Sequence, residues 1–175
     1  DDNEKEMLSN VAAMKADGTV SKIIVLINSA NALQVDFLKD NTYNVDACLW
    51  IGDVGITGIN AVADILAGNV NPSGSLVDTY CYDNMSSPAM ANFTPVTYEG
   101  YTEELVPEKA KSYMVYQEGI YVGYKYYETR YEDTVMGTGN AGSYVYSDDV
   151  AFPFGYGLSY TDFEYSDMTG VYDAA

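Results

Sequence analysis

Residues 22–28, with the sequence KIIVLIN, form a continuous apolar run that is rich in β-branched side chains. A run of this length and composition is typical of a β-strand that is covered on both faces, as in a parallel sheet. Residues 47–51, ACLWI, repeat the pattern, and a short helix is predicted between the two runs, over residues 32–38, with Leu33 and Phe37 on its inner side. The two runs therefore predict neighbouring parallel strands joined by a crossover.

A helix is predicted on either side of this pair of strands. Before it, Asn3 and Glu6 have the spacing of a capping box, and the helix ends at Gly18. After it, a second helix ends near Gly68 and carries an apolar stripe at positions i, i+3, i+4 and i+7, formed by Ile59, Val62, Ala63 and Leu66. Residues 75–81 then supply a third strand. The order β-α-β-α-β predicts an α/β fold with parallel strands and right-handed connections.

Short polar segments follow the first two predicted strands. They are Asn28-Ser29 and Gly52-Asp53, and ligands of open α/β sheets bind beyond such carboxyl ends. The second segment opens a loop with the spacing G-x-x-G-x-x-G. This spacing differs from that of dinucleotide-binding loops, no P-loop lysine is present, and Asp53 would repel a phosphate. Nucleotide binding is therefore disfavoured.

The net charge of −18 and the absence of histidine exclude several functions. Nucleic acids and anionic membrane surfaces are poor partners for so acidic a chain. No Ser-His-Asp or Cys-His pair can form within it, so acid–base chemistry falls to Asp, Glu, Lys, Tyr or Cys. The acidic pairs lack the spacing of a calcium loop, and neither a metal nor a cofactor is predicted. Cys48 is expected to be a small buried residue, and a Cys48–Cys81 disulfide is left open.

Residues 116–128, YQEGIYVGYKYYE, combine a carboxyl group with a glycine and several tyrosines. The alternation from Ile120 to Tyr127 predicts a strand, with Glu118 at its mouth. An aromatic surrounding disfavours the charged form of a carboxyl group, as a catalytic acid requires. Residues 83–115 are predicted to make a long surface excursion, and residues 129–149 a hairpin or irregular loop. The residues alone leave two roles open for Glu118, a catalytic acid or a solvated side chain.

Four segments, in this order, resemble the C-terminal α/β sandwich domain of family 3 glycoside hydrolases, the β-glucosidases and their relatives. They are IIVLINSANALQVDFL, VDACLWIGDVGITGINAVADILAGNVNPSGSL, YQEGIYVGYKYYE and FPFGYGLSYTDFEYS. The resemblance implies an α/β fold, a three-layer sandwich with a mostly parallel sheet, over residues 1–160, with its first strands missing. It also implies that residues 161–175 begin a fibronectin-III-like β domain.

The resemblance also implies a catalytic role. Family 3 enzymes are retaining hydrolases in which an Asp nucleophile on a (β/α)8 barrel works with an acid/base Glu on the sandwich domain. In the branch with an EGIYVGYRYYD-like segment, that Glu matches Glu118. Other branches place the acid in the Gly-rich loop, where this sequence has Ile56-Thr57 instead of an acidic pair, and this departure favours Glu118. Asp53 is a further candidate for contacting the sugar.

The chain is therefore predicted to be part of a β-glucosidase-like enzyme that removes terminal β-linked sugars, and to be inactive without the barrel domain. Its expected partners are a β-glucoside or related oligosaccharide and that barrel. The alternative is a non-catalytic carbohydrate-binding or interaction module on the same fold, because the aromatic side chains also suit stacking on sugars. A barrel with an Asp nucleophile in the same polypeptide would favour the enzyme. The sequence leaves the location of the protein open.

Overall fold

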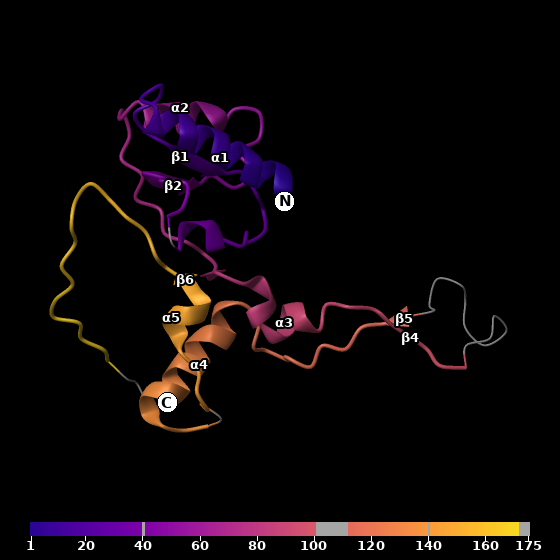
Figure 1. The fold of residues 1–175 in the computed structure, drawn as a ribbon. Helices are drawn as coiled ribbons and strands as arrows, with labels where there is room; N and C mark the ends of the chain where they lie inside the picture. Colours follow the sequence, from indigo (N-terminus) through magenta and orange to yellow (C-terminus); the bar gives the residue numbers. More distant parts are fainter. Residues whose placement is uncertain (40, 101–111, 140, 172–175) are drawn as a thin grey trace.

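A computed structural model of the chain describes residues 1–39, 41–100, 112–139 and 141–171. Its first part contains the elements α1 (Asp2–Ala16), β1 (Ile24–Ile27), the 3-10 helix η1 (Asp36–Leu38), β2 (Ala47–Trp50) and α2 (Ile59–Leu66). Its second part contains β3 (Tyr80–Cys81), the 3-10 helix η2 (Asn84–Ser86), α3 (Pro88–Ala91), β4 (Val96–Thr97), β5 (Ser112–Tyr113), α4 (Tyr124–Met136), α5 (Tyr146–Asp149) and β6 (Val150–Phe152). The two parts lie one above the other in Figure 1, and the β4–β5 ribbon projects from the second.

Strands β1 and β2 pair in parallel, as the two apolar runs predict. Ile24 lies opposite Ala47, and Ile27 lies opposite Trp50. The carboxyl ends of the strands therefore meet at one edge, where Trp50 Nε1 donates a hydrogen bond to the carbonyl of Ser29 (2.9 Å). The chain is an α/β protein at this level, with helices and small sheets.

Two details predicted for this first part are wrong. The connection between the strands is helical only in η1, because the Val35 N–H donates to the carbonyl of Cys81 (3.1 Å) instead of to a helical neighbour. Cys48 is exposed rather than buried, since β2 has a partner strand on one side only within the part of the chain that the structure describes. Cys48 and Cys81 are both free thiols, so the disulfide does not form.

Helix α1 has a capping box, but it is formed by Asp1 and Glu4 rather than by Asn3 and Glu6. The Asp1 carboxylate accepts a hydrogen bond from the Glu4 N–H (2.9 Å), and the Glu4 carboxylate is paired with the N-terminal ammonium. This arrangement satisfies the first free N–H groups of the helix, which therefore begins earlier than predicted.

Helix α2 follows the predicted apolar stripe, but only Val62 of the stripe is buried. Ile59 and Leu66 remain about half exposed. Gly68 has a left-handed backbone (φ +76°) just beyond the helix, as expected of a residue that ends one.

The third predicted strand, residues 75–81, is reduced to β3, and β3 does not join the parallel pair. It pairs antiparallel with β6, with Tyr80 opposite Phe152. The preceding backbone is used elsewhere, because the Leu76 N–H donates to the carbonyl of Tyr156 (2.7 Å) and the Leu76 carbonyl accepts from the Gly155 N–H (2.7 Å). The β-α-β-α-β sheet of three parallel strands is therefore wrong for the described residues.

The strand predicted from Ile120 to Tyr127 is also wrong, because helix α4 begins at Tyr124. Gly123 adopts φ +57° and ψ −132°, a conformation that is open to glycine and that separates the preceding turn from the helix. The helix ends at Gly137, which is left-handed (φ +65°). Residues 129–149, predicted as a hairpin or loop, contain the rest of α4 and the short helix α5.

Two buried clusters lie on opposite sides of β3. The first core cluster consists of Ile27, Val35 and Tyr80. The second core cluster consists of Cys81, Tyr127 and Val150. Successive side chains of a strand point to opposite faces, and neighbours in β3 accordingly serve different clusters. β3 thus joins the two parts of the molecule.

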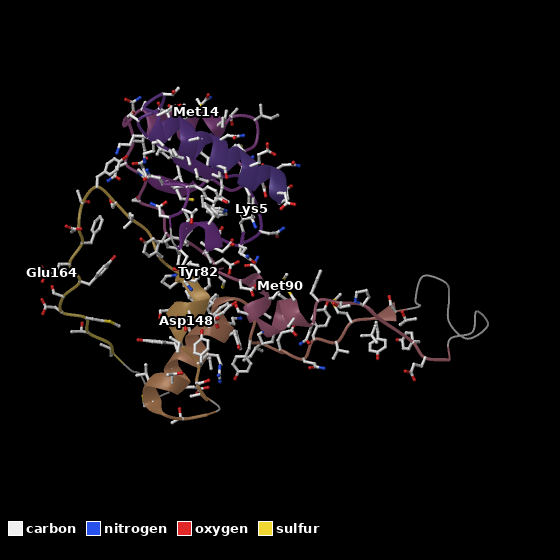
Figure 2. The ribbon with its side chains drawn as sticks, in the orientation of Figure 1. Lys5, Met14, Tyr82, Met90, Asp148 and Glu164 are labelled. Carbon is white, nitrogen blue, oxygen red and sulfur yellow. The ribbon has the colours of Figure 1, made fainter. Side chains whose placement is uncertain are left out.

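The excursion predicted for residues 83–115 is present in its described portion. It contains η2, α3 and the β4–β5 ribbon, in which the rings of Tyr98 and Tyr113 lie 4.9 Å apart. Residues 101–111 lie outside the described ranges. Residues 161–171 form no strand and follow an open arc after β6, on which Glu164 lies apart from Tyr82, Met90 and Asp148 (Figure 2). Within the described ranges, no helix is both long and apolar enough to cross a membrane.

Candidate active site

Glu118 lies in the turn that leads into helix α4. Its carbonyl accepts a hydrogen bond from the Tyr121 N–H (2.9 Å), and Gly119 between them adopts a left-handed backbone (φ +58°). Such a turn forms a short, well-defined loop before the helix and presents the Glu118 side chain from it. The local sequence Glu-Gly-Ile-Tyr therefore fixes the backbone position from which the Glu118 side chain extends.

The Glu118 carboxyl group opens into a pocket of about 480 Å³. Within the described part of the chain, its Oε2 atom is buried and has no hydrogen-bond partner. A buried polar atom left without a partner is uncommon in folded proteins and often marks a functional group. Glu118 thus combines a buried, unpartnered carboxyl oxygen with a place in the lining of this pocket.

One wall of the pocket is a face of helix α4. Tyr126, Thr129, Arg130 and Asp133 line the pocket and follow one another at positions i, i+3, i+4 and i+7, which share one helix face. Arg130 is held in place by a hydrogen bond from its Nη2 atom to the carbonyl of Ala141 (2.7 Å). The remaining walls come from the turn, through Gln117 and Tyr121, and from α3, through Pro88 and Asn92.

The neighbouring face of α4 packs into the second core cluster. The hydroxyl groups of Tyr127 and Ser86 share a hydrogen bond (2.8 Å). Tyr146 of α5 donates a hydrogen bond to Glu128 Oε1 (2.6 Å), and its ring lies 4.9 Å from that of Tyr131. Burial is the main cause that raises the pKa values of the Tyr127 and Tyr146 phenols, so both stay protonated and take part in the hydrogen bonds of this packing.

Three segments far apart in the sequence meet at the start of α4. A Cβ atom on Gly123 would lie 3.2 Å from Asp78 Oδ1, and the ring of Tyr124 stacks on that of Phe154 (4.4 Å between centroids). The turn that carries Glu118 is therefore held against one end of the antiparallel β3–β6 pair, where β3 begins and β6 ends.

The segments that contain NPSG and FGYGLSYT also contact each other. Asn71 donates a hydrogen bond from Nδ2 to Ser159 Oγ (3.1 Å) and accepts one from the Tyr160 N–H (3.3 Å). A Cβ atom on Gly157 would lie only 2.7 Å from the carbonyl oxygen of Gly74, so this approach requires glycine. The two most specific segments of the sequence thus form one contact.

The structure does not bring Asp53 to Glu118. Asp53 follows β2, does not line the Glu118 pocket, and accepts a hydrogen bond at Oδ1 from the Gly55 N–H (3.3 Å), which is the geometry of a local turn. Over the described ranges, no group of three or more His, Cys, Asp or Glu side chains is arranged to hold a metal ion.

Sequence reasoning missed most of the residues that surround Glu118. The sequence predicts a strand for Tyr126 and a hairpin or loop for Arg130 and Asp133, although their spacing, with Thr129, is that of a helix face. That spacing was the signal that could have found them. No pattern in the sequence places Asn92 beside Glu118, because it reaches the pocket only through the path of α3.

Fold and site together define an α/β protein with a carboxyl-bearing pocket of the size and mixed polar and aromatic lining that small ligands use. Residues 1–124 match the C-terminal domain of glycosyl hydrolase family 3. The chain therefore belongs to this family, as the resemblance of its sequence motifs implied.

Known relatives are similar over most of this chain. It is 32% identical to a β-glucosidase of Ruminococcus albus over 94% of its length and 14% of that protein. It is 38% identical to β-glucosidase A of Butyrivibrio fibrisolvens over 82% of its length and 14% of that protein. The crystal structure of a β-glucosidase from Paenibacillus barengoltzii covers 87% of the chain with a TM-score of 0.59 and 32% identity, and the match spans 13% of that protein. The chain thus spans about a seventh of the length of these relatives.

Proposed function

We propose that this chain supplies the general acid/base of a retaining, β-glucosidase-like glycoside hydrolase, and that Glu118 is that residue. The observation that carries the proposal is the buried, unpartnered Oε2 atom of Glu118 in a pocket of about 480 Å³. The family supports the reaction class, and the segment around Glu118 resembles the acid-bearing segment of one of its branches.

In the proposed reaction, Glu118 protonates the glycosidic oxygen while a second carboxylate attacks the anomeric carbon. Glu118 then removes a proton from the water that releases the sugar. Retaining enzymes hold the two carboxyl groups about 5–5.5 Å apart. We assign the attacking group to an Asp on a (β/α)8 barrel outside these residues, and the substrate to a terminal, non-reducing β-linked glucose or a similar sugar. Asp53 is proposed only as a peripheral contact to that sugar.

The proposed architecture places residues 1–160 in a three-layer α/β sandwich and makes residues 161–175 the start of a fibronectin-III-like domain. The parallel β1–β2 pair supports the first assignment. Exposed apolar side chains on β1 and α2 support further covering layers, because Ile24 is 48% exposed, Ile59 50% and Leu66 48%.

Replacing Glu118 in the full-length protein tests the proposal. Glu118→Gln should lower kcat/KM on a β-linked glucose disaccharide by about 10²–10⁴-fold, the usual contribution of a general acid. Glu132→Gln is the matched control, because Glu132 lies on the exposed side of α4 and does not line the pocket. The Glu118→Ala variant should recover turnover of an activated aryl glucoside in azide and yield a β-glucosyl azide, because the anion replaces the water that Glu118 activates.

Unchanged hydrolysis of the disaccharide by Glu118→Gln would show that another residue is the acid. A full-length protein that binds glucosides in this pocket but hydrolyses none would favour the non-catalytic, carbohydrate-binding alternative.

A further inference from the structure

We infer that the pocket beside Glu118 is the subsite for the sugar that leaves, and that Asn92 and Tyr126 bind its hydroxyl groups. This inference rests on the proposed function, because the identity of the proton donor decides which half of the substrate the pocket faces. It adds a specificity role for Asn92, which follows α3, and for Tyr126 of α4; both line the pocket without being neighbours of Glu118 in sequence.

The reaction itself places the leaving sugar on the Glu118 side. The bond between the anomeric carbon and the glycosidic oxygen breaks, and its electron pair goes to the oxygen. That oxygen takes the proton of the Glu118 carboxyl group, and the second sugar departs as a neutral alcohol. The attacking carboxylate approaches the anomeric carbon from the opposite side. Groups that surround the proton donor therefore face the departing sugar.

The pocket has the size for such a ligand. Its volume of about 480 Å³ falls within the range of roughly 300–1,000 Å³ that small-molecule sites occupy. It is bounded by three separate segments: α3, the turn at Gln117–Tyr121 and the polar face of α4. An open pocket with walls from three segments can contact a ring on more than one side.

The lining suits a sugar better than an apolar leaving group. Tyr121 and Tyr126 offer aromatic surface to the apolar face of a ring. Asn92 and Gln117 offer amides, each of which can donate and accept hydrogen bonds. In the described residues, neither amide side chain forms a hydrogen bond within the chain, so both are available to hydroxyl groups.

Asn92 and Tyr126 are both held in place by neighbouring groups. The Asn92 N–H donates to the carbonyl of Pro88 (2.9 Å), which fixes the end of α3. The ring of Tyr126 packs edge-on against that of the buried Tyr127, with 5.1 Å between centroids. A side chain held in this way loses little freedom when a ligand binds, which favours its use in recognition.

The test compares two substrates in the full-length enzyme. A β-linked glucose disaccharide has a leaving sugar that occupies the pocket, whereas β-glucosyl fluoride has none and releases fluoride without a proton donor. For Asn92→Ala and Tyr126→Phe, the ratio of kcat/KM on the disaccharide to kcat/KM on the fluoride should fall by about 3–10-fold, the effect of one lost hydrogen bond. Tyr131→Phe is the matched control, because Tyr131 packs against Tyr146 away from the pocket, and it should leave the ratio as in the wild type.

An unchanged ratio in both variants would overturn the inference, as would a ratio that falls equally in the Tyr131→Phe control. Hydrolysis of the fluoride shows in each case that the variant is folded. Glu118→Gln separates this inference from the proposed function. If that variant loses the disaccharide activity while the ratios of the pocket variants stay unchanged, only the subsite is wrong. If it keeps the activity, the proposed function is wrong.

Discussion

The two core clusters on opposite sides of strand β3 contain different kinds of side chains. On the first side, Tyr80 packs with the aliphatic Ile27 and Val35. On the second side, Cys81 packs with Tyr127 and Val150, and the Tyr127 hydroxyl group shares a hydrogen bond with that of Ser86. The first side carries the parallel strands, and the second side carries α4 and with it one wall of the Glu118 pocket.

The difference shows which side controls the chemistry. On the first side, burial packs Ile27 and Val35 against Tyr80, and the hydrogen bonds of that side reach neither α4 nor the Glu118 pocket among the described residues. The second side orients α4 through specific hydrogen bonds, which depend on distance and angle. A catalytic acid must be held closely in position. We therefore expect changes on the second side to reach the active site and changes on the first side to stay local.

Truncating Tyr127 should have the largest effect. Tyr127→Ala removes a ring that is 3% exposed, and such large-to-small changes cost about 3–5 kcal/mol. Tyr127→Phe keeps the ring but loses the bond to Ser86, which costs about 1 kcal/mol. Hydrogen exchange of the full-length protein should show faster exchange in α4 and β6 for Tyr127→Ala and a much smaller change for Tyr127→Phe.

The matched truncation on the first side is Val35→Ala, since Val35 is 1% exposed. It should speed exchange in β1 and η1 and leave α4 unchanged. If Val35→Ala loosened α4 as much as Tyr127→Ala does, the two sides would form one cooperative unit and the comparison would be wrong.

Gly123→Ala should have the next largest effect. Gly123 lies between the turn that carries Glu118 and helix α4. The left-handed backbone of Gly123 and the 3.2 Å approach of a Cβ atom to Asp78 Oδ1 together impose a strain of about 1–3 kcal/mol. Because this residue joins the Glu118 turn to α4, kcat/KM on the disaccharide should fall.

Gly18→Ala is the control for Gly123→Ala. It also places a side chain at positive φ (+84°), but it stands in open space beyond α1. Its thermal stability should fall while its kcat/KM stays at the wild-type level. Equal losses of activity in both variants would mean that general destabilisation, and not displacement of Glu118, explains the effect.

The same contrast explains which elements could be predicted from the sequence. β1, β2, α1 and α2 follow from local signals: apolar runs for the two strands, a capping pattern for α1 and an apolar stripe for α2. The segment from Tyr121 to Tyr127 carries an alternation that suits a strand. Its helix depends instead on Tyr127 packing against β3 and β6, and those contacts come from distant residues. Tertiary packing overrode the local pattern.

The site was predictable only in part for a related reason. Glu118 was singled out because its segment resembles that of a known family, whereas its own chemistry left two roles open. Arg130 and Asp133 come to the pocket only once α4 is a helix, and Asn92 only once α3 turns the chain. Residues 75–79 were assigned to a strand because nothing local shows that Leu76 pairs with Gly155 and Tyr156.

Asp46, on the first side, gives the smallest expected effect. Its carboxylate accepts hydrogen bonds from Lys15 Nζ (2.6 Å), the Ile23 N–H (2.8 Å) and Lys22 Nζ (3.1 Å), and so ties α1 to the strands. These bonds, that from Lys15 above all, hold the pKa of Asp46 well below its ordinary value of 3.8. A carboxyl group whose pKa is lower in the folded state stabilises the fold at pH values above its unfolded pKa. This contribution is lost progressively as the pH falls from the unfolded pKa through the folded pKa.

In Asp46→Asn, hydrogen exchange in α1 should therefore be faster than in the wild type near neutral pH. On acidification below about pH 5, wild-type α1 should progressively lose protection, after correction for intrinsic exchange rates, and the loss should continue towards the lowered pKa of Asp46. Asp162→Asn, in the arc after β6, supplies the control and should behave as the wild type. Because solvent screens this network, the change should stay small and confined to the first side. A loss of kcat/KM in Asp46→Asn would contradict the separation of the two sides. Among the described residues, no contact of this carboxylate reaches the second core cluster or the Glu118 pocket.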